Sequence, residues 1–388
     1  MQKPFREIFI MIVKTPPMGW NSWNTFGGNI NEELIKTTAD TMVNEGYLDA
    51  GYEYLVIDDC WSKRVRNEKG ELEPDPEKFP NGMKAVADYV HSKGLKFGMY
   101  SCAGNYTCAV YPGSYEYEFI DARTFAEWGV DYLKYDLCHY PGSGDVRNSY
   151  LTMSMALRST GREILFAGCT CGTYDPWDWM RSIGAHMYRS HADITDEYEA
   201  FRYIAQTQLP NFKYSGPGCF NDMDMLVVGM GGEGNVSHTG GCTDEEYLMH
   251  FSLWCLWGTP LMMGADIRNV NEYCRSVMLN RELIALNQDP DARAPFYEEK
   301  QRYASKARMG LLKFLANGEI VIAYYNFDIN PLQVLLYFDD YGIPGGSNYG
   351  LELTDILTGE NIGVKFDCYN PTLPGRSFKI YKAKFVER

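Results

Sequence analysis

The sequence predicts an α/β protein in which a (β/α)8 TIM barrel is followed by a C-terminal antiparallel β-sandwich domain. Eight strand-like apolar runs alternate with helical patterns up to residue 286, and such alternation indicates a parallel sheet with helical crossovers. Four of these strands end in carboxylates, as expected at the C-terminal face of a barrel. After Pro290 the pattern changes to short β-branched and aromatic runs. The rival fold, a doubly wound open sheet, is disfavoured because no glycine-rich turn follows the first strand.

The expected strands are short runs rich in aromatic and β-branched residues. In chain order they cover residues 18–23, 52–58, 95–100, 131–138, 163–167, 186–190, a run ending near Asn221, and 260–263. The expected helices between and after them cover residues 32–45, 83–93, 121–128, 150–158, 177–183, 197–207, 245–257 and 270–286. In the first helix, apolar residues recur at helical spacing from Leu34 to Val43, and Gly46 follows its end. Asp244 is an N-cap candidate for the seventh helix.

The chain divides into three expected parts. Residues 1–14 form an N-terminal extension, residues 15–292 the catalytic barrel, and residues 306–388 the β-sandwich domain. In the last part the runs 311–315, 320–325, 334–338 and 378–381 are strand-like, and turns containing glycine separate them.

Composition excludes several classes of function. The net charge of -15 disfavours nucleic acid as a partner, and no apolar run approaches the ~20 residues of a membrane span. The apolar run at residues 8–13 is too short for a signal peptide, so a cytoplasmic location is expected. The scatter of eleven cysteines fits a reducing compartment. With only six histidines and one isolated CxC motif, neither a metal site nor a cofactor is indicated.

Acidic residues at the strand ends are the strongest functional signal. Lys134 and Asp136 lie two residues apart, so both side chains point to the same side of one strand. The simplest interpretation is an ion pair with a purely structural role in packing. The same pattern recurs at three further strand ends, however. These ends carry Asp58 and Asp59, Asp193, and Asp222 and Asp224. We therefore expect a cluster of carboxylates at one end of the sheet.

Several motifs together resemble glycoside hydrolase family 27, the α-galactosidases and α-N-acetylgalactosaminidases. The matching stretches are residues 15–23, 49–61, 91–100, 134–138, 189–193, 216–226 and 285–290, in the order and spacing of that family. The resemblance implies a small-molecule carbohydrate substrate, and because family members often self-associate it also implies a homo-oligomer.

The resemblance also implies roles for single residues. Asp136 falls on the nucleophile and Asp193 on the acid/base; Asp58 and Asp59 fall on the pair that binds the 4- and 6-hydroxyls of galactose. The remaining positions are Lys134 near the 3- and 4-hydroxyls, Arg189 near the 2-hydroxyl, and Trp23, Tyr100, Asp224 and Met225 in the pocket wall. Cys108 and Cys138 fall on a pair that is bridged in secreted members, whereas a cytoplasmic protein can keep them reduced.

The chemistry of glycoside hydrolysis explains why these residue types are needed. Two carboxyl groups must flank the scissile bond, one to attack the anomeric carbon and the other to protonate the leaving oxygen. Lys134 beside Asp136 is expected to hold the nucleophile ionised. The resemblance thus implies a retaining exo-α-galactosidase, and a barrel that binds sugar without catalysis is the alternative from another class.

One loop departs from the family pattern and bears on the substrate. Smaller departures, Leu137 and Met223, touch no catalytic role. In residues 168–174, Cys169 stands where galactosidases have Glu, Thr170 where they have Trp, and Gly172 near a bulky Leu. That loop faces the sugar's 2-substituent in the family. A wider pocket is expected unless Tyr174 or Trp177 refills the space. The alternatives are therefore α-N-acetylgalactosaminidase and, third, β-L-arabinopyranosidase.

Overall fold

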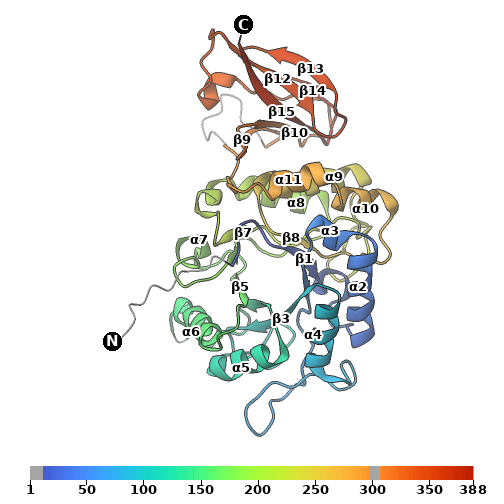
Figure 1. Cartoon of the computed structure of the whole chain (residues 1–388), viewed down its shortest axis with the longest axis vertical. Helices are drawn as coiled ribbons and strands as arrows, with labels where there is room; N and C mark the ends of the chain where they lie inside the picture. Colours follow the sequence, from blue (N-terminus) through green and yellow to red (C-terminus); the bar gives the residue numbers. More distant parts are fainter. Residues whose placement is uncertain (1–11, 143, 297–305, 388) are drawn as a thin grey trace.

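The computed structural model describes residues 12–142, 144–296 and 306–387. Most of the expected N-terminal extension, residues 1–11, lies outside the described residues, as does the stretch 297–305 between the two expected domains. Figure 1 shows the larger part of the chain as a barrel of strands surrounded by helices, with a β-domain stacked on one side. Within the described ranges, none of the helices has the length and apolar run that crossing a bilayer would take.

Eight parallel strands form one sheet in the order β7-β6-β5-β4-β3-β2-β1-β8. They are β1 (Met18–Asn21), β2 (Tyr54–Val56), β3 (Lys96–Cys102), β4 (Tyr132–Asp136), β5 (Leu165–Cys169), β6 (Met187–Arg189), β7 (Phe220–Asp222) and β8 (Leu261–Met263). The ends of the sheet meet just after β7, where the backbone N–H of Leu226 donates to Met262 O at 2.7 Å. Gly264 N donates to Leu226 O at 2.9 Å on the other side. The expected barrel is confirmed.

The helices follow the strands in the expected alternation. They are α1 (Trp23–Phe26), α2 (Glu32–Asn44), α3 (Tyr47–Ala50), α4 (Gly82–Ser92), α5 (Glu118–Trp128), α6 (Val146–Ser159), α7 (Pro176–Trp179), α8 (Tyr198–Thr207), α9 (Asp244–Trp257), α10 (Glu272–Met278) and α11 (Arg281–Asn287). The single helix expected over 270–286 is wrong, because the Asn280 side chain accepts from Leu283 N and starts a new helix there. Thr243, not Asp244, caps α9 through a capping box with Glu246.

The C-terminal part is a five-stranded antiparallel sheet, ordered β13-β12-β15-β10-β9, beside a two-stranded sheet of β11 and β14. Its strands are β9 (Arg308–Phe314), β10 (Ile320–Asn326), β11 (Leu332–Gln333), β12 (Tyr349–Asp355), β13 (Asn361–Lys365), β14 (Thr372–Leu373) and β15 (Ser377–Glu387). The strand expected over 334–338 is wrong. Its apolar side chains are buried, but Leu336 N bonds to the side chain of Asn370 and Val334 N to Pro371 O, so no regular ladder continues there.

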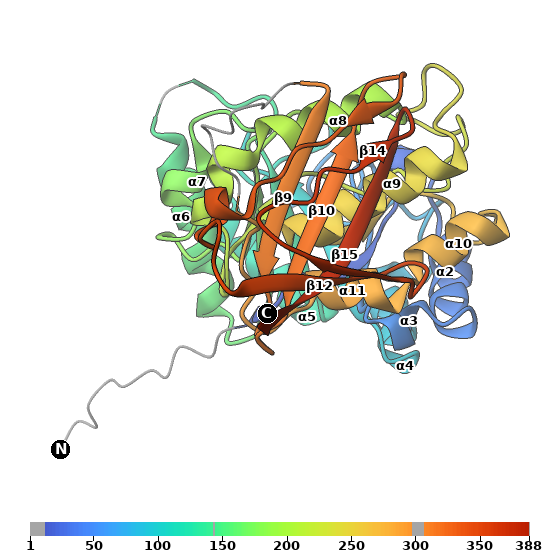
Figure 2. The same ribbon diagram turned by 90° about the horizontal axis from the view of Figure 1, so that it is seen from above.

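Strand β10 of the five-stranded sheet is buried on both of its faces. Ile320, Ile322 and Tyr324 of β10 pack into the core of the β-domain, whereas the alternating residues Val321 and Ala323 join the core of the barrel. Figure 2 shows this sheet lying over α8, α9 and α11. Helix α9 is apolar on all sides because it lies between the sheet of the barrel and the sheet of the β-domain.

Lys313 of β9 is an unusual member of this interface because it is fully buried. Its Nζ donates to Leu286 O at 2.8 Å and to Leu256 O at 3.2 Å. These carbonyls belong to the last turns of α11 and α9. Carbonyl oxygens at the end of a helix have no N–H donor within their own helix and carry the negative end of its dipole, so a lysine ammonium binds them well. Burial lowers the pKa of Lys313 to about 8. One lysine of the β-domain thus joins two helix ends of the barrel.

We predict that Lys313→Met changes how the free energy of unfolding depends on pH. Between pH 8 and 10 the unfolded chain binds more protons at this lysine than the folded chain does, so the lysine penalises folding less as pH rises. Relative to the variant, the free energy of unfolding of the parent should rise by about 2 kcal/mol between pH 8 and pH 10. Urea unfolding at both pH values measures this difference. Lys384→Met, at an exposed position of β15, is the control and should show no such gain; a pH-independent difference for Lys313→Met would contradict the prediction.

Candidate active site

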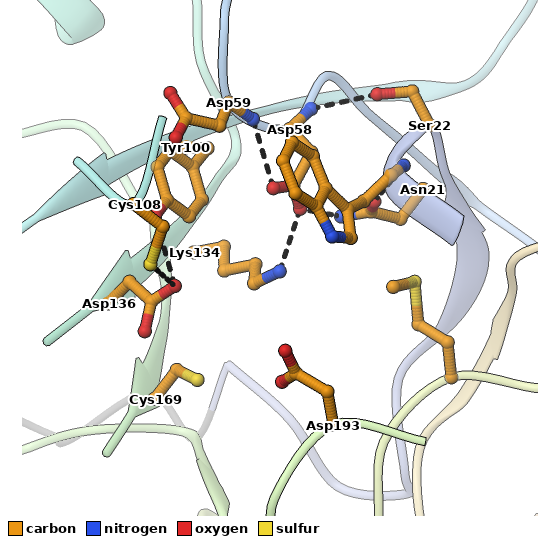
Figure 3. Close-up of polar contacts among 12 residues, drawn as sticks. Asn21, Ser22, Asp58, Asp59, Tyr100, Cys108, Lys134, Asp136, Cys169 and Asp193 are labelled. Atoms are coloured by element: carbon orange, nitrogen blue, oxygen red, sulfur yellow. Dashed lines mark hydrogen bonds and ion pairs between the residues drawn. The ribbon is translucent and has the colours of Figure 1, made fainter. Parts of the chain in front are cut away.

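The C-terminal ends of the barrel strands surround one open cavity. Its lining residues are Trp23, Asn24, Asp58, Asp59, Tyr100, Cys108, Lys134, Asp136, Cys169, Arg189, Asp193, Asp224, Met225 and Val236. The expected gathering of carboxylates at one end of the sheet is therefore what the structure has. Figure 3 shows the carboxyl groups of Asp136 and Asp193 pointing toward the same space from different sides.

Asp58 and Lys134 form a buried ion pair in the cavity wall. Nζ of Lys134 lies 2.8 Å from Oδ2 of Asp58, and Asn21 Nδ2 donates to the same oxygen at 2.7 Å (Figure 3). The backbone N–H of Asp59 donates to the other oxygen at 2.9 Å. Burial disfavours a charged lysine, but attraction to Asp58 and Asp136 outweighs it and raises the pKa of Lys134. The sequence predicted Asp136 as the lysine's partner; the structure pairs the ammonium with Asp58 instead.

Two backbone N–H groups and the Thr107 side chain hold the carboxylate of Asp59. Its carboxylate accepts from Cys60 N at 2.7 Å and from Ala109 N at 3.0 Å. Cys60 adopts φ +71°, the sharp turn that carries the chain away from the barrel directly after the two aspartates. Burial raises the pKa of Asp59. The side chain is thus held rigidly with little access to bulk water.

Asp136 is the last residue of β4 and is 8% exposed. Tyr100 OH donates to its Oδ2 at 3.0 Å, and Leu137 N donates to its Oδ1 at 2.8 Å. Sγ of Cys108 lies 3.8 Å from Oδ2, and Cys108 is joined to Cys138 in a disulfide. The pairing implied by the resemblance is therefore present. One hydrogen bond on each oxygen holds the carboxylate in a single orientation.

Arg189 joins Asp193 to Asp224. Its Nη2 lies 2.7 Å from an oxygen of each carboxylate. Asp224 also accepts from Ile194 N at 2.7 Å, so it holds both the arginine and the backbone next to Asp193. Burial raises the pKa of Asp224 to about 7 despite the arginine. The Asp193 side chain is 70% exposed, and the charge of Arg189 lowers its pKa.

The loop after β5 takes a path that sequence reasoning did not foresee. Tyr174 is 58% exposed, and neither it nor Trp177 lines the cavity, so neither refills the space beside Cys169. Gly172 has φ +78°, and a Cβ there would lie 2.6 Å from Ser190 O. Glycine is therefore needed for close packing of two loops, not to widen the pocket. The hydroxyl of Thr170 donates to Thr173 O at 2.7 Å and points into the loop itself.

The structure places every site residue predicted from the sequence in the cavity wall except Tyr174 and Cys138, the disulfide partner of Cys108. Sequence reasoning missed Asn21, Asn24, Cys171 and Val236. The two asparagines sit at the end of β1 and just beyond it, so the strand-end criterion used for the aspartates could have found them. Val236 lies in the long segment between β7 and α9 and carries no local signal.

Comparisons with known proteins show which family the chain resembles. A family model described as "Alpha galactosidase A" matches residues 15–289. The chain is 47% identical over 279 residues to α-galactosidase 3 of Arabidopsis thaliana, covering 72% of this chain and 61% of that protein. It thus spans less than two thirds of that relative's length.

Solved structures cover nearly the whole chain. The crystal structure of α-galactosidase I from Mortierella vinacea superposes with a TM-score of 0.88 at 31% identity, covering 97% of this chain and 98% of that one. An α-galactosidase from Saccharomyces cerevisiae with raffinose gives 0.84 at 28% identity, covering 96% and 98%. Because the family model matches well over half of the chain, this protein belongs to the α-galactosidase family, glycoside hydrolase family 27.

Proposed function

We propose that this protein hydrolyses terminal α-D-galactosyl residues of small galactosides with retention of configuration. The observation that carries the proposal is the pair of carboxyl groups, Asp136 and Asp193, which enter one pocket from different strand ends beside the Asp58–Lys134 ion pair. The curated relative named above is an α-galactosidase, and the yeast relative holds raffinose. Terminal galactose of a small oligosaccharide is thus the substrate class that these relatives favour.

The reaction needs two displacements at the anomeric carbon. In the first, a carboxylate oxygen of Asp136 forms a bond to that carbon while the aglycone oxygen leaves and takes a proton from Asp193. In the second, Asp193 removes a proton from water, the water oxygen bonds to the carbon, and Asp136 is released. The fixed, buried carboxylate of Asp136 suits the nucleophile because its orientation is set before substrate binds.

Asp193 must carry a proton for the first step, although Arg189 lowers its pKa in the free protein. Its side chain is largely exposed, so a bound sugar would remove water from around it. Desolvation disfavours the charged form of a carboxylic acid and therefore raises its pKa. Asp224 also shares the arginine, which limits how strongly that cation stabilises ionised Asp193. This arrangement supports assigning Asp193 as the acid/base.

Asp58, Asp59 and Lys134 suit the recognition of sugar hydroxyls. Two ionised or hydrogen-bonding carboxylates side by side accept from two neighbouring hydroxyls, and the ammonium donates to a third. The pair of aspartates also supports a hexose over β-L-arabinopyranoside, which lacks the CH2OH group. The open side next to Cys169 supports some tolerance of a 2-acetamido group. We therefore keep the order galactose, then N-acetylgalactosamine, then L-arabinopyranose.

A cytoplasmic location and a homo-oligomer remain predictions. The disulfide between Cys108 and Cys138 weighs against the cytoplasmic location, because such bonds persist mainly in oxidising compartments.

We predict that proton NMR of aryl α-galactoside hydrolysis detects α-galactose first and its β-anomer only after mutarotation. Two displacements at one carbon restore the starting configuration.

Asp136→Asn should lower turnover by about 1,000-fold or more, because the amide is a poor nucleophile. It should still bind galactose in calorimetry. The exposed Asp88→Asn serves as control. Initial β-galactose would contradict retention, and full activity of Asp136→Asn would favour a binding protein with a contaminating hydrolase.

We further predict the order of kcat/KM on three aryl glycosides that share one leaving group. The α-galactoside should exceed the α-N-acetylgalactosaminide, because no matched contacts for the acetamido group are evident in the wall beside Cys169. The β-L-arabinopyranoside should come third, because it leaves part of the Asp58–Asp59 pair without a partner. A preference for the acetamido sugar would overturn this order.

A further inference from the structure

The two thiols of the loop after β5 have no part in the proposed hydrolysis. Cys169 is 4% exposed at the end of β5, and Cys171 is half-buried with φ +49°. Their sulfur atoms lie 3.7 Å apart. One carboxylate oxygen of Asp136 and both sulfurs all lie within 4.8 Å of one another. Sγ of Cys171 is also 3.9 Å from Oδ1 of Asp193.

These separations fit a tetrahedral metal centre. With Zn–S bonds of about 2.3 Å, tetrahedral geometry places two thiolate sulfurs about 3.8 Å apart. The observed sulfur–sulfur separation of 3.7 Å needs almost no adjustment. The sequence lacks the second cysteine pair of a structural zinc site, but the fold places the carboxylate of Asp136 beside both sulfurs. Asp193 lies near Cys171 but is not a member of that cluster. Two thiolates and one carboxylate suit a cation that accepts both sulfur and oxygen, with the fourth tetrahedral position left to water.

The charge of the surroundings also favours a cation. Among the residues that the structure describes, five aspartates but only Lys134 and Arg189 as cations line the cavity. A second cluster, Cys108 with Cys138 and Asp136, is not available for the same role, because its sulfurs are bonded to each other. Cys169 and Cys171 are both free thiols.

We propose that Cys169, Cys171 and Asp136 form a reversible binding site for a d10 divalent cation of the Zn²⁺ or Cd²⁺ class. On binding, each thiol releases one proton, two metal–sulfur bonds and one metal–oxygen bond to Asp136 form, and the ion keeps a water as fourth ligand without any change in oxidation state. The ion occupies the carboxylate of Asp136, which the proposed hydrolysis requires as nucleophile, so it excludes the sugar. The site is therefore inhibitory. The inhibition rests on the proposed function, whereas metal binding does not.

The binding test is a titration of the full-length protein with CdCl2 alone, without added thiols, read by the ultraviolet Cd–thiolate absorption. We expect one equivalent with that band. Cys171→Ser should weaken binding by about 100-fold or more, because a hydroxyl is a poor ligand for a soft cation. Cys169→Ser should do the same, and Cys171→Ser on the half-buried loop still decides the question if the buried variant fails to fold. Cys368→Ser, in the β-domain, is the matched control and should bind as the parent does.

The activity test measures initial rates on an aryl α-galactoside with increasing CdCl2. We expect inhibition that is competitive with the galactoside, is reversed by EDTA and is weakened in Cys171→Ser by the same factor as binding. An absorption band that survives in both cysteine variants, or inhibition independent of galactoside concentration, would overturn the proposal. If the band appears and depends on Cys171 while no galactoside is hydrolysed, the metal site stands and the proposed function fails.

Discussion

The site depends on how five carboxylates, four of them buried, are kept together in one cavity. Five aspartates line one cavity, and each is neutralised or hydrogen-bonded by a specific neighbour. Lys134 forms an ion pair with Asp58, and Arg189 forms ion pairs with both Asp193 and Asp224. Backbone N–H groups donate hydrogen bonds to Asp59. Without these partners, buried like charges at such distances would be too costly to retain. A parallel barrel provides the partners because the carboxyl ends of all its strands meet at one face. The same excess of negative charge makes the cavity suited to hydroxyl donors and to cations.

The β-domain is linked to this cavity through α9, although none of its described residues, 306–387, lies in the cavity wall. Helix α9 is in contact with both: Lys313 of β9 donates to Leu256 O near its end, and Trp254 Nε1 donates to Asp224 O at 2.8 Å. Asp224 in turn holds Arg189 and the backbone beside Asp193. A continuous path of packed side chains and hydrogen bonds thus leads from the five-stranded sheet to Asp193. The core of the barrel includes residues of β9 and β10, which explains why side chains on both faces of these two strands are apolar.

Much of the architecture could be predicted from the sequence because it depends on local pattern. The alternation of strands and helices predicts the barrel. The carboxylates at the strand ends predict which face of the barrel carries the site. What failed depends on contacts between distant segments. Lys134 has two aspartates within reach, and only the closeness of β2 and β4 across β3 selects Asp58. The loop after β5 is set by its packing on Ser190, which is why Tyr174 points away from the cavity. The segment 334–338 has strand-like residues but lacks a regular partner strand, since Asn370 and Pro371 oppose it.

The proposed mechanism requires Asp136 to form a covalent bond to the anomeric carbon. The most direct measurement is mass spectrometry of the protein after reaction with 5-fluoro-α-D-galactosyl fluoride, whose ring fluorine slows both steps while its leaving group keeps the first accessible. The account predicts that the intact mass rises by one fluorogalactosyl residue and that peptide fragmentation places the label on Asp136. Attachment to Asp193 or to a cysteine, or turnover of the reagent without any adduct, would contradict it.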